Sequence, residues 1–150
     1  MSVTVVPGDP RDPAATALLK ASHVLMESLF PSESNHYLGV EALLAPEIRF
    51  YVAYDGDRMV GTGALAVRDG YGELKSMFVD PAARGTGAGA AIVTQLIVRA
   101  KMERVPILKL ETGSLLHAAH RMYERAGFTR CGPFGDYVGG EFSLFMEKAL

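Results

Sequence analysis

The sequence predicts one mixed α/β domain built on a mostly antiparallel sheet. A long helical pattern at 88–104 is followed by a strand at 107–111, as in a right-handed βαβ unit with parallel strands. The chain has 150 residues and neither an internal repeat nor a linker, so we expect a single domain over 1–150. Three β-rich runs joined by short turns precede the helix and predict an antiparallel meander: 48–54, 59–67 and 72–79.

Shorter elements are expected before the meander. Val3 to Val6 reads as an edge strand that Pro7-Gly8 ends. Asp12 and Pro13 are typical of a helix start, as N-cap and first helical residue. The expected apolar stripe of this helix consists of Leu18, Leu25, Met26 and Leu29. A second short helix is expected over 37–44, where Pro46 stops it.

The C-terminal part alternates once more between helix and strand. A helix is expected over 115–126 with Gly127 as its C-cap glycine. Strands at 129–131 and 142–146 close the fold, and the glycine-rich stretch 132–140 between them is a loop.

Composition and charge exclude several classes of function. A net charge of −2 without a basic stripe argues against nucleic acid as a partner. The single cysteine, Cys131, forms no internal disulfide or multi-cysteine metal site and fits a reducing cytoplasm. No apolar run reaches membrane-spanning length. We therefore expect no membrane span, and we expect a cytoplasmic protein. We also expect no metal.

The most informative stretch is Val79-Asp80-Pro81-Ala82-Ala83-Arg84-Gly85-Thr86-Gly87-Ala88-Gly89, between a strand and a helix. Glycines let a ligand approach the backbone closely, and a helix start presents free N–H groups with partial positive charge. Together with an arginine, they predict a site for a phosphate.

Two templates fit these glycines. Gly85, Gly87 and Ala90 match the dinucleotide fingerprint G-x-G-x-x-G/A, with Glu111 near the place of a ribose-binding acid. Against that template, 80–84 separates the glycines from the strand, and the chain offers only one βαβ unit. A P-loop is excluded because no Gly-Lys-Ser/Thr is present.

The second template is Arg-x-x-Gly-x-Gly, matched from Arg84 to Gly89. With Met77-Phe78-Val79-Asp80-Pro81 before it and Met122-Tyr123-Glu124-Arg125-Ala126-Gly127-Phe128 behind it, the chain resembles the GNAT family of acetyl-CoA-dependent N-acetyltransferases. The resemblance covers about 48–148. The stretches 132–137 and 145–148 look like a small-molecule branch labelled indole-acetic-acid acetyltransferase-like.

The resemblance implies a fold and a cofactor. The fold is a mixed sheet of six to seven strands with about four helices, splayed between the fourth and fifth strands. Acetyl-CoA is the implied co-substrate, with its pantetheine arm against the strand and a backbone N–H, that of Val79, polarising the thioester carbonyl. The implied contacts are Met77, Phe78 and Val79 for the arm, and Arg84, Gly85, Thr86, Gly87, Ala88 and Gly89 for the pyrophosphate.

Catalysis needs a base, because a protonated amine has no free lone pair. Glu73 is the first candidate, placed where histone-type members of the family carry a glutamate, and it is expected to share a strand face with Lys75 and Met77. Its alternative role is a salt bridge with Lys75 or Arg68. Glu111 or water are the other candidate bases. Tyr123 is the implied general acid for the CoA thiolate.

The acceptor site is less visible in the sequence. Arg49 and Arg68 are candidates for a substrate carboxylate, or lie on the outer face of the sheet. Leu116 stands where many family members carry a cofactor-contacting asparagine; His117 and His120 could replace it, but both are expected to be exposed. Polar candidates from the loop after the first helix are Ser32, Glu33, Asn35, His36 and Tyr37, and Glu111 is a further candidate.

The resulting interpretation is an N-acetyltransferase that passes acetyl from acetyl-CoA directly to a primary amine of a small molecule, with no covalent enzyme intermediate. The alternative is a non-catalytic acyl-CoA-binding module of the same fold. We expect no nucleic acid or membrane partner, and a homodimer is compatible with the exposed β-edge.

Overall fold

A seven-stranded sheet forms the centre of the molecule, in the order β1-β2-β3-β4-β5-β7-β6. The structure is a computed structural model, and it describes residues 3–32, 35 and 38–150. The strands are β1 Val3–Pro7, β2 Ile48–Asp55, β3 Arg58–Val67, β4 Gly72–Val79, β5 Ile107–Gly113, β6 Thr129–Cys131 and β7 Ser143–Ala149. All neighbouring strands pair antiparallel except β4 and β5, which are parallel, as the meander and the βαβ unit predict.

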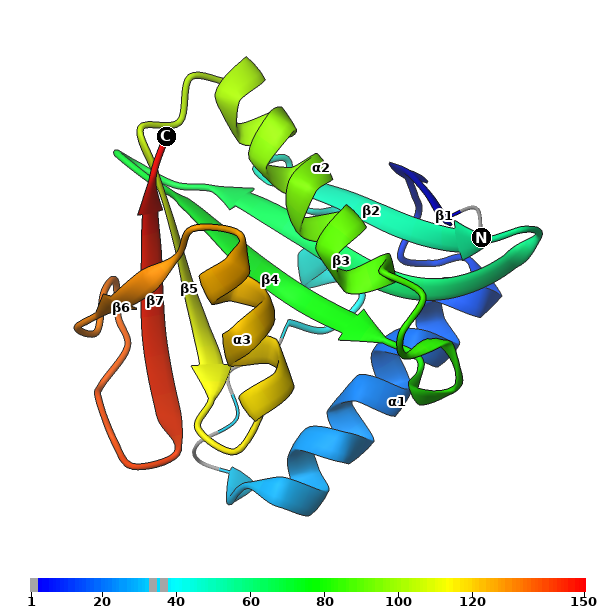
Figure 1. Cartoon of the computed structure of the whole chain (residues 1–150), viewed down its shortest axis with the longest axis horizontal. Coiled ribbons are helices and arrows are strands. Elements are labelled where there is room, and N and C mark those ends of the chain that lie inside the picture. Colours follow the sequence, from blue (N-terminus) through cyan, green and yellow to red (C-terminus); the bar gives the residue numbers. More distant parts are fainter. Residues whose placement is uncertain (1–2, 33–34, 36–37) are drawn as a thin grey trace.

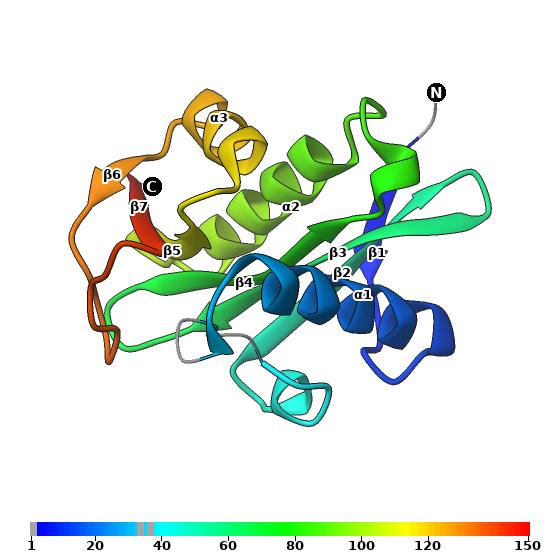
Figure 2. The same ribbon diagram turned by 90° about the horizontal axis from the view of Figure 1, so that it is seen from below.

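Helices cover both faces of the sheet. The three α-helices of the described chain are α1 Pro13–Leu29, α2 Ala88–Met102 and α3 His117–Arg125; η2 Ala42–Leu44 and η3 Pro81–Ala83 are single 3₁₀ turns. Figures 1 and 2 show α2 and α3 on one face and α1 on the other. No helix in the described ranges is long and apolar enough to cross a membrane.

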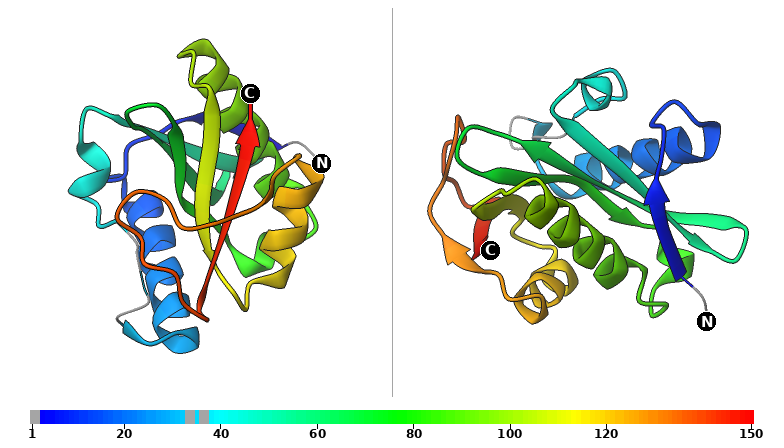
Figure 3. Two further views of the ribbon diagram at one scale, coloured as in Figure 1. Left: turned by 90° about the vertical axis from the view of Figure 1, so that its left-hand side faces the viewer. Right: turned by 90° about the horizontal axis from the view of Figure 1, so that it is seen from above.

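Two apolar cores correspond to these two faces. The larger one packs α2 and α3 on the sheet, and it includes Ile92, Leu96, Leu108, Leu110 and Tyr123. The smaller one packs α1 on β2 and β3 around Leu19, Phe50, Val52 and Ala64. Figure 3 shows both layers from the side and from above.

Helix α1 begins as expected but buries a shifted stripe. The Asp12 carboxylate accepts a hydrogen bond from the N–H of Ala14, and Pro13 opens the helix. The buried residues are Ala15, Leu18, Leu19 and Ser22. The expectation for Leu29 is wrong: this side chain is 38% exposed, because the helix leaves the sheet before it ends.

The splay between the fourth and fifth strands is confirmed. Strands β4 and β5 pair over only three positions, from Gly72 opposite Leu108 to Leu74 opposite Leu110. Beyond Leu74 the two strands diverge, which leaves one edge of β4 without a strand partner. Figure 1 shows the gap opening toward the carboxyl ends of both strands.

A β-bulge in β4 changes the direction of the strand at this gap. Between Lys75 opposite Ala64 and Phe78 opposite Thr62, two residues of β4 oppose one residue of β3. Ser76 takes a positive φ of 55° there. Glu73 and Lys75 share a face as predicted, but Met77 packs on the α2 face instead, because the extra residue shifts the alternation by one.

The expected helix over 37–44 is also wrong in its described part. Residues 38–44 contain one 3₁₀ turn, η2, whose Leu43 is buried against the α1 core. Tyr37, the first residue of that expected helix, lies outside the described residues.

Candidate active site

A cavity of about 110 Å³ occupies the gap between β4 and β5. Strand β5 contributes its last residues, β4 contributes the bulge, and α1 and α3 close the sides. The walls are formed by Ser22, Met26, Phe30, Asn35, Leu74, Lys75, Ser76, Met77, Glu111, Thr112, Gly113, Leu116, Tyr123 and Phe142. The cavity therefore joins the two faces of the sheet at the point where the strands separate.

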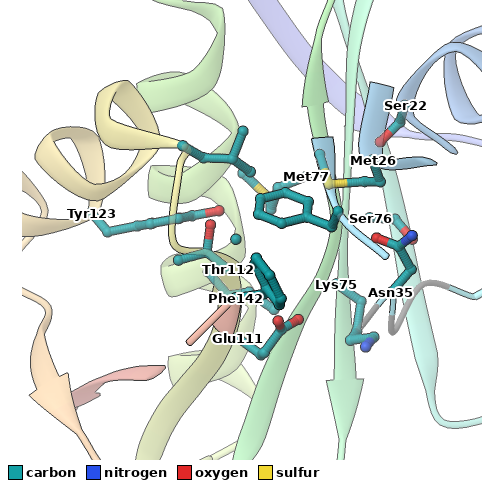
Figure 4. Close-up of a pocket in the computed structure, with 14 residues that line it drawn as sticks. Ser22, Met26, Asn35, Lys75, Ser76, Met77, Glu111, Thr112, Tyr123 and Phe142 are labelled. Carbon is teal, nitrogen blue, oxygen red and sulfur yellow. The ribbon is translucent and has the colours of Figure 1, made fainter. Parts of the chain in front are cut away.

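Tyr123 approaches the cavity from the α3 side. Its ring is buried with 4% exposure and contacts Phe128 edge to face, and Figure 4 shows its hydroxyl directed into the cavity near Thr112. Burial, and to a lesser extent the charge of Glu111, raises the pKa of Tyr123 above that of a free tyrosine. The hydroxyl therefore keeps its proton at neutral pH and is available as a donor.

Glu111 lies on the opposite face of the sheet, at the wall of the same cavity. One carboxylate oxygen accepts a hydrogen bond of 2.9 Å from the hydroxyl of Ser143 in β7. Figure 4 shows the carboxylate pointing into the gap toward β4.

Glu73 is not among the residues that line the cavity. It is 3% exposed, and its carboxylate contacts two cations, Arg68 at 3.4 Å and Lys75 at 3.5 Å. The hydroxyl of Tyr137 donates a 2.5 Å hydrogen bond to it and accepts one of 2.7 Å from Lys75. We call Arg68, Glu73, Lys75 and Tyr137 the buried ion cluster; it ties the loop between β6 and β7 to the sheet.

The glycine motif forms the loop from η3 into α2, as the sequence predicts. Gly85 and Gly87 have positive φ of 83° and 85°, and Gly87 is the N-cap of α2. The first N–H groups of α2 have no acceptor inside the helix and point out of its N-terminus. Arg84 is exposed beside them. The loop therefore has the geometry of an anion site with a nearby cation.

Of the other site residues predicted from the sequence, some line the cavity and others do not. Glu33, His36 and Tyr37 lie outside the described residues, whereas Asn35 lines the cavity. Arg49 is away from the cavity and pairs with Glu103, the C-cap of α2, at 2.7 Å.

Leu116, in place of the asparagine, lines the cavity. His117 is exposed as expected, but the expectation for His120 is wrong. His120 is 5% exposed, and a ring nitrogen lies 2.8 Å from the carbonyl oxygen of Gly113, so it closes the turn between β5 and α3.

Several cavity residues were not singled out by sequence reasoning. Ser22 lies one turn before Met26 of the predicted apolar stripe, so the helical pattern could have shown that both share one face of α1; Phe30 follows as the extended C-cap of the helix. Thr112 and Phe142 have no such pattern, because only the pairing of β5 with β7 brings them to the gap.

Comparisons with known proteins agree with this geometry. The model of the acetyltransferase (GNAT) family matches residues 16–128. The chain is 38% identical to an IAA acetyltransferase of Azospirillum brasilense, over 99% of both chains. A solved structure from Klebsiella pneumoniae, provisionally named an acyl-CoA N-acyltransferase, has 30% identity and a TM-score of 0.84 over 99% of this chain and 97% of that one. A Bacillus subtilis acetyltransferase solved with CoA shares the fold, with a TM-score of 0.72, 16% identity and coverage of 99% of both chains.

The match with the family model spans most of the chain, and the relative from Azospirillum is aligned almost end to end. The splayed parallel pair, the glycine loop at the start of α2 and Tyr123 of α3 all lie within the residues that the family model matches. This protein is an N-acetyltransferase of the GNAT family.

Proposed function

We propose that this protein transfers an acetyl group from acetyl-CoA to the primary amine of a small molecule, by direct attack of the amine on the thioester. The observation that carries the proposal is the cavity in the β4–β5 gap, which has Tyr123 on one face of the sheet and Glu111 on the other. An acid and a candidate base thus flank a cavity in which a thioester could lie.

The cofactor would reach this place from the glycine loop. Its pyrophosphate fits the N-terminus of α2, where the helix dipole and Arg84 favour negative charge. From there the pantetheine arm can run along the unpaired edge of β4 and form strand-like hydrogen bonds with 77–79. The arm ends at the cavity, which Met77 lines.

Two backbone donors of β4 face the gap. The carbonyl oxygen of Ser76 accepts from the hydroxyl of Thr62 in β3, so the Met77 N–H of the same trans peptide points the other way. The N–H of Asp80 donates to Val60 in β3, and the alternation of a strand then directs the Val79 N–H away from β3. Since Met77 lines the cavity, we assign the oxyanion donor to its N–H, with Val79 holding the arm.

Glu111 is the better placed of the two candidate carboxylates. It lines the cavity, whereas the Glu73 carboxylate already receives Arg68, Lys75 and Tyr137. We therefore assign the base to Glu111, acting directly or through a water molecule.

The proposed reaction balances with these groups. Glu111 takes a proton from the ammonium, and the amine nitrogen attacks the thioester carbon. The carbon–sulfur bond breaks, and the sulfur receives a proton from Tyr123. The second proton of the amine nitrogen restores the Tyr123 hydroxyl, directly or through water, and Glu111 releases its proton to solvent. The products are an N-acetyl amine and CoA with a free thiol, and no covalent enzyme intermediate forms.

The test is acetyl-CoA-dependent thiol release across a panel of amines, with mass spectrometry of the products. We expect amine-dependent release and a mass increase of one acetyl group. Tight binding of acetyl-CoA without turnover on any acceptor would instead favour the non-catalytic module.

A further inference from the structure

We infer that the acceptor is an amino acid, whose amine faces Glu111 and whose carboxylate is bound by Asn35, Ser76 and Lys75 on the opposite wall of the cavity. The inference rests on the proposed function, because it names the substrate class of the same site. It comes from the chemistry of the residues that line the cavity: in Figure 4, Asn35, Ser76 and Lys75 lie on the α1 side of β4, and Glu111 lies on the other side of that strand.

The wall on the β4 side consists of hydrogen-bond donors. The amide nitrogen of Asn35 and the hydroxyl of Ser76 are buried and have no hydrogen-bond partner among the described residues. A buried polar group without a partner is destabilising, so two of them at one cavity indicate a ligand that satisfies them. An amide nitrogen and a hydroxyl both donate, and a carboxylate accepts from both.

The charge of this wall also favours an anion. Lys75 lines the cavity with a side chain that is 9% exposed, and it is one of two cations around the single carboxylate of Glu73. Because the Lys75 side chain is mostly buried, its field is screened less than at the surface.

The opposite wall has the complementary charge. Glu111 presents a carboxylate to the cavity, which suits the ammonium group of the acceptor before deprotonation. A molecule with an ammonium and a carboxylate a few bonds apart therefore matches both walls at once. A simple alkylamine would leave the Asn35 and Ser76 donors without a partner.

The apolar residues of the cavity limit the rest of the acceptor. Phe30, Met26 and Phe142 line it, so the part of the acceptor next to its amino and carboxylate groups would contact apolar side chains.

The experiment compares acceptors that differ only at the carboxylate. Alanine, serine and leucine are each tested beside their carboxamides and their decarboxylated amines, by kcat/KM for thiol release. We expect kcat/KM to be roughly 10- to 100-fold higher for the acids than for the amides and amines, the range of one or two charged hydrogen bonds.

Amides or amines that react as well as the acids would overturn the inference while the proposed function stands. If acetyl-CoA binds but no amine of any kind is acetylated, the proposed function fails, and the inference fails with it.

Two variants test whether Asn35 and Lys75 bind the acceptor carboxylate. Asn35→Asp places a negative charge beside the acceptor carboxylate, and Lys75→Met removes the positive one. Each should lower the preference for the acid over the amine at least about tenfold. Lys109→Met is the matched control, because Lys109 lies on the neighbouring strand, pairs with Glu147 at 3.2 Å and does not line the cavity. Calorimetric titration of the amino acid into the CoA-loaded protein reports the same preference without turnover, and an unchanged affinity in both variants would contradict the assignment.

Discussion

The two sides of the β4–β5 gap are built in different ways. The proposed cofactor side would use mainly backbone groups from one continuous stretch: the edge of β4, η3, the glycine loop and the start of α2. The proposed acceptor side would use side chains from separate segments, namely Asn35 after α1, Lys75 and Ser76 in β4, and Glu111 in β5. Backbone recognition suits a cofactor that does not vary, whereas side chains can be exchanged singly to change the acceptor.

This difference also explains which parts of the site could be predicted from the sequence. The glycine motif is local, and the positive φ of Gly85 and Gly87 favours glycine, so the loop between η3 and α2 could be predicted from the sequence, and its role in binding the cofactor stays a prediction. The acceptor side depends on pairing between distant strands and on the bulge at Ser76. Nothing in Lys75-Ser76-Met77 marks a bulge, so the alternation rule placed Met77 on the wrong face.

The largest effect should come from Glu111, the residue that distinguishes our assignment from the sequence-based preference for Glu73. We expect Glu111→Gln to lower kcat/KM about 10³-fold, because the amine then lacks a base, while the Kd of acetyl-CoA stays unchanged. Steady-state kinetics and calorimetry measure the two quantities.

Glu73→Gln is the matched control for that variant. It should leave the chemical step largely intact but lower the free energy of unfolding by about 1–3 kcal/mol, since Arg68 and Lys75 lose their buried counter-charge. If kcat/KM is unchanged in Glu111→Gln but strongly reduced in Glu73→Gln, the base is Glu73.

Tyr123 belongs to the cofactor side and should have the next largest effect. Tyr123→Phe removes the proton donor for the departing thiolate but keeps the buried ring, so kcat should fall about 10²-fold with little change in fold or in CoA affinity. Single-turnover kinetics would isolate this step. A variant with full activity would exclude Tyr123 from the mechanism.

A backbone change tests the cofactor side directly. Gly87→Ala forces a Cβ onto a residue with a φ of 85°, which costs about 1–2 kcal/mol and moves the N-terminus of α2. We expect the affinity for CoA to fall about tenfold with no change in the preference among acceptors. Gly39→Ala is the control, because Gly39 has open space around it and no positive φ.

The smallest expected effect is on alkaline stability, and it involves one tyrosine from each side of the gap. Burial raises the pKa of Tyr123 and Tyr137; the charge of Glu111 adds to the first shift and the hydrogen bond to Glu73 to the second. In the unfolded chain a tyrosine ionises near pH ~10, whereas these two keep their protons when folded. The stabilising contribution is therefore complete below pH ~10 and is lost as the pH rises above it, because unfolding then releases protons.

Denaturant unfolding between about pH 9 and 11 should give a shallower loss of stability in Tyr123→Phe and in Tyr137→Phe than in the wild type. Equal slopes in all three proteins would mean that neither hydroxyl is held in its neutral form by the fold, and the case for Tyr123 as a protonated acid would weaken accordingly.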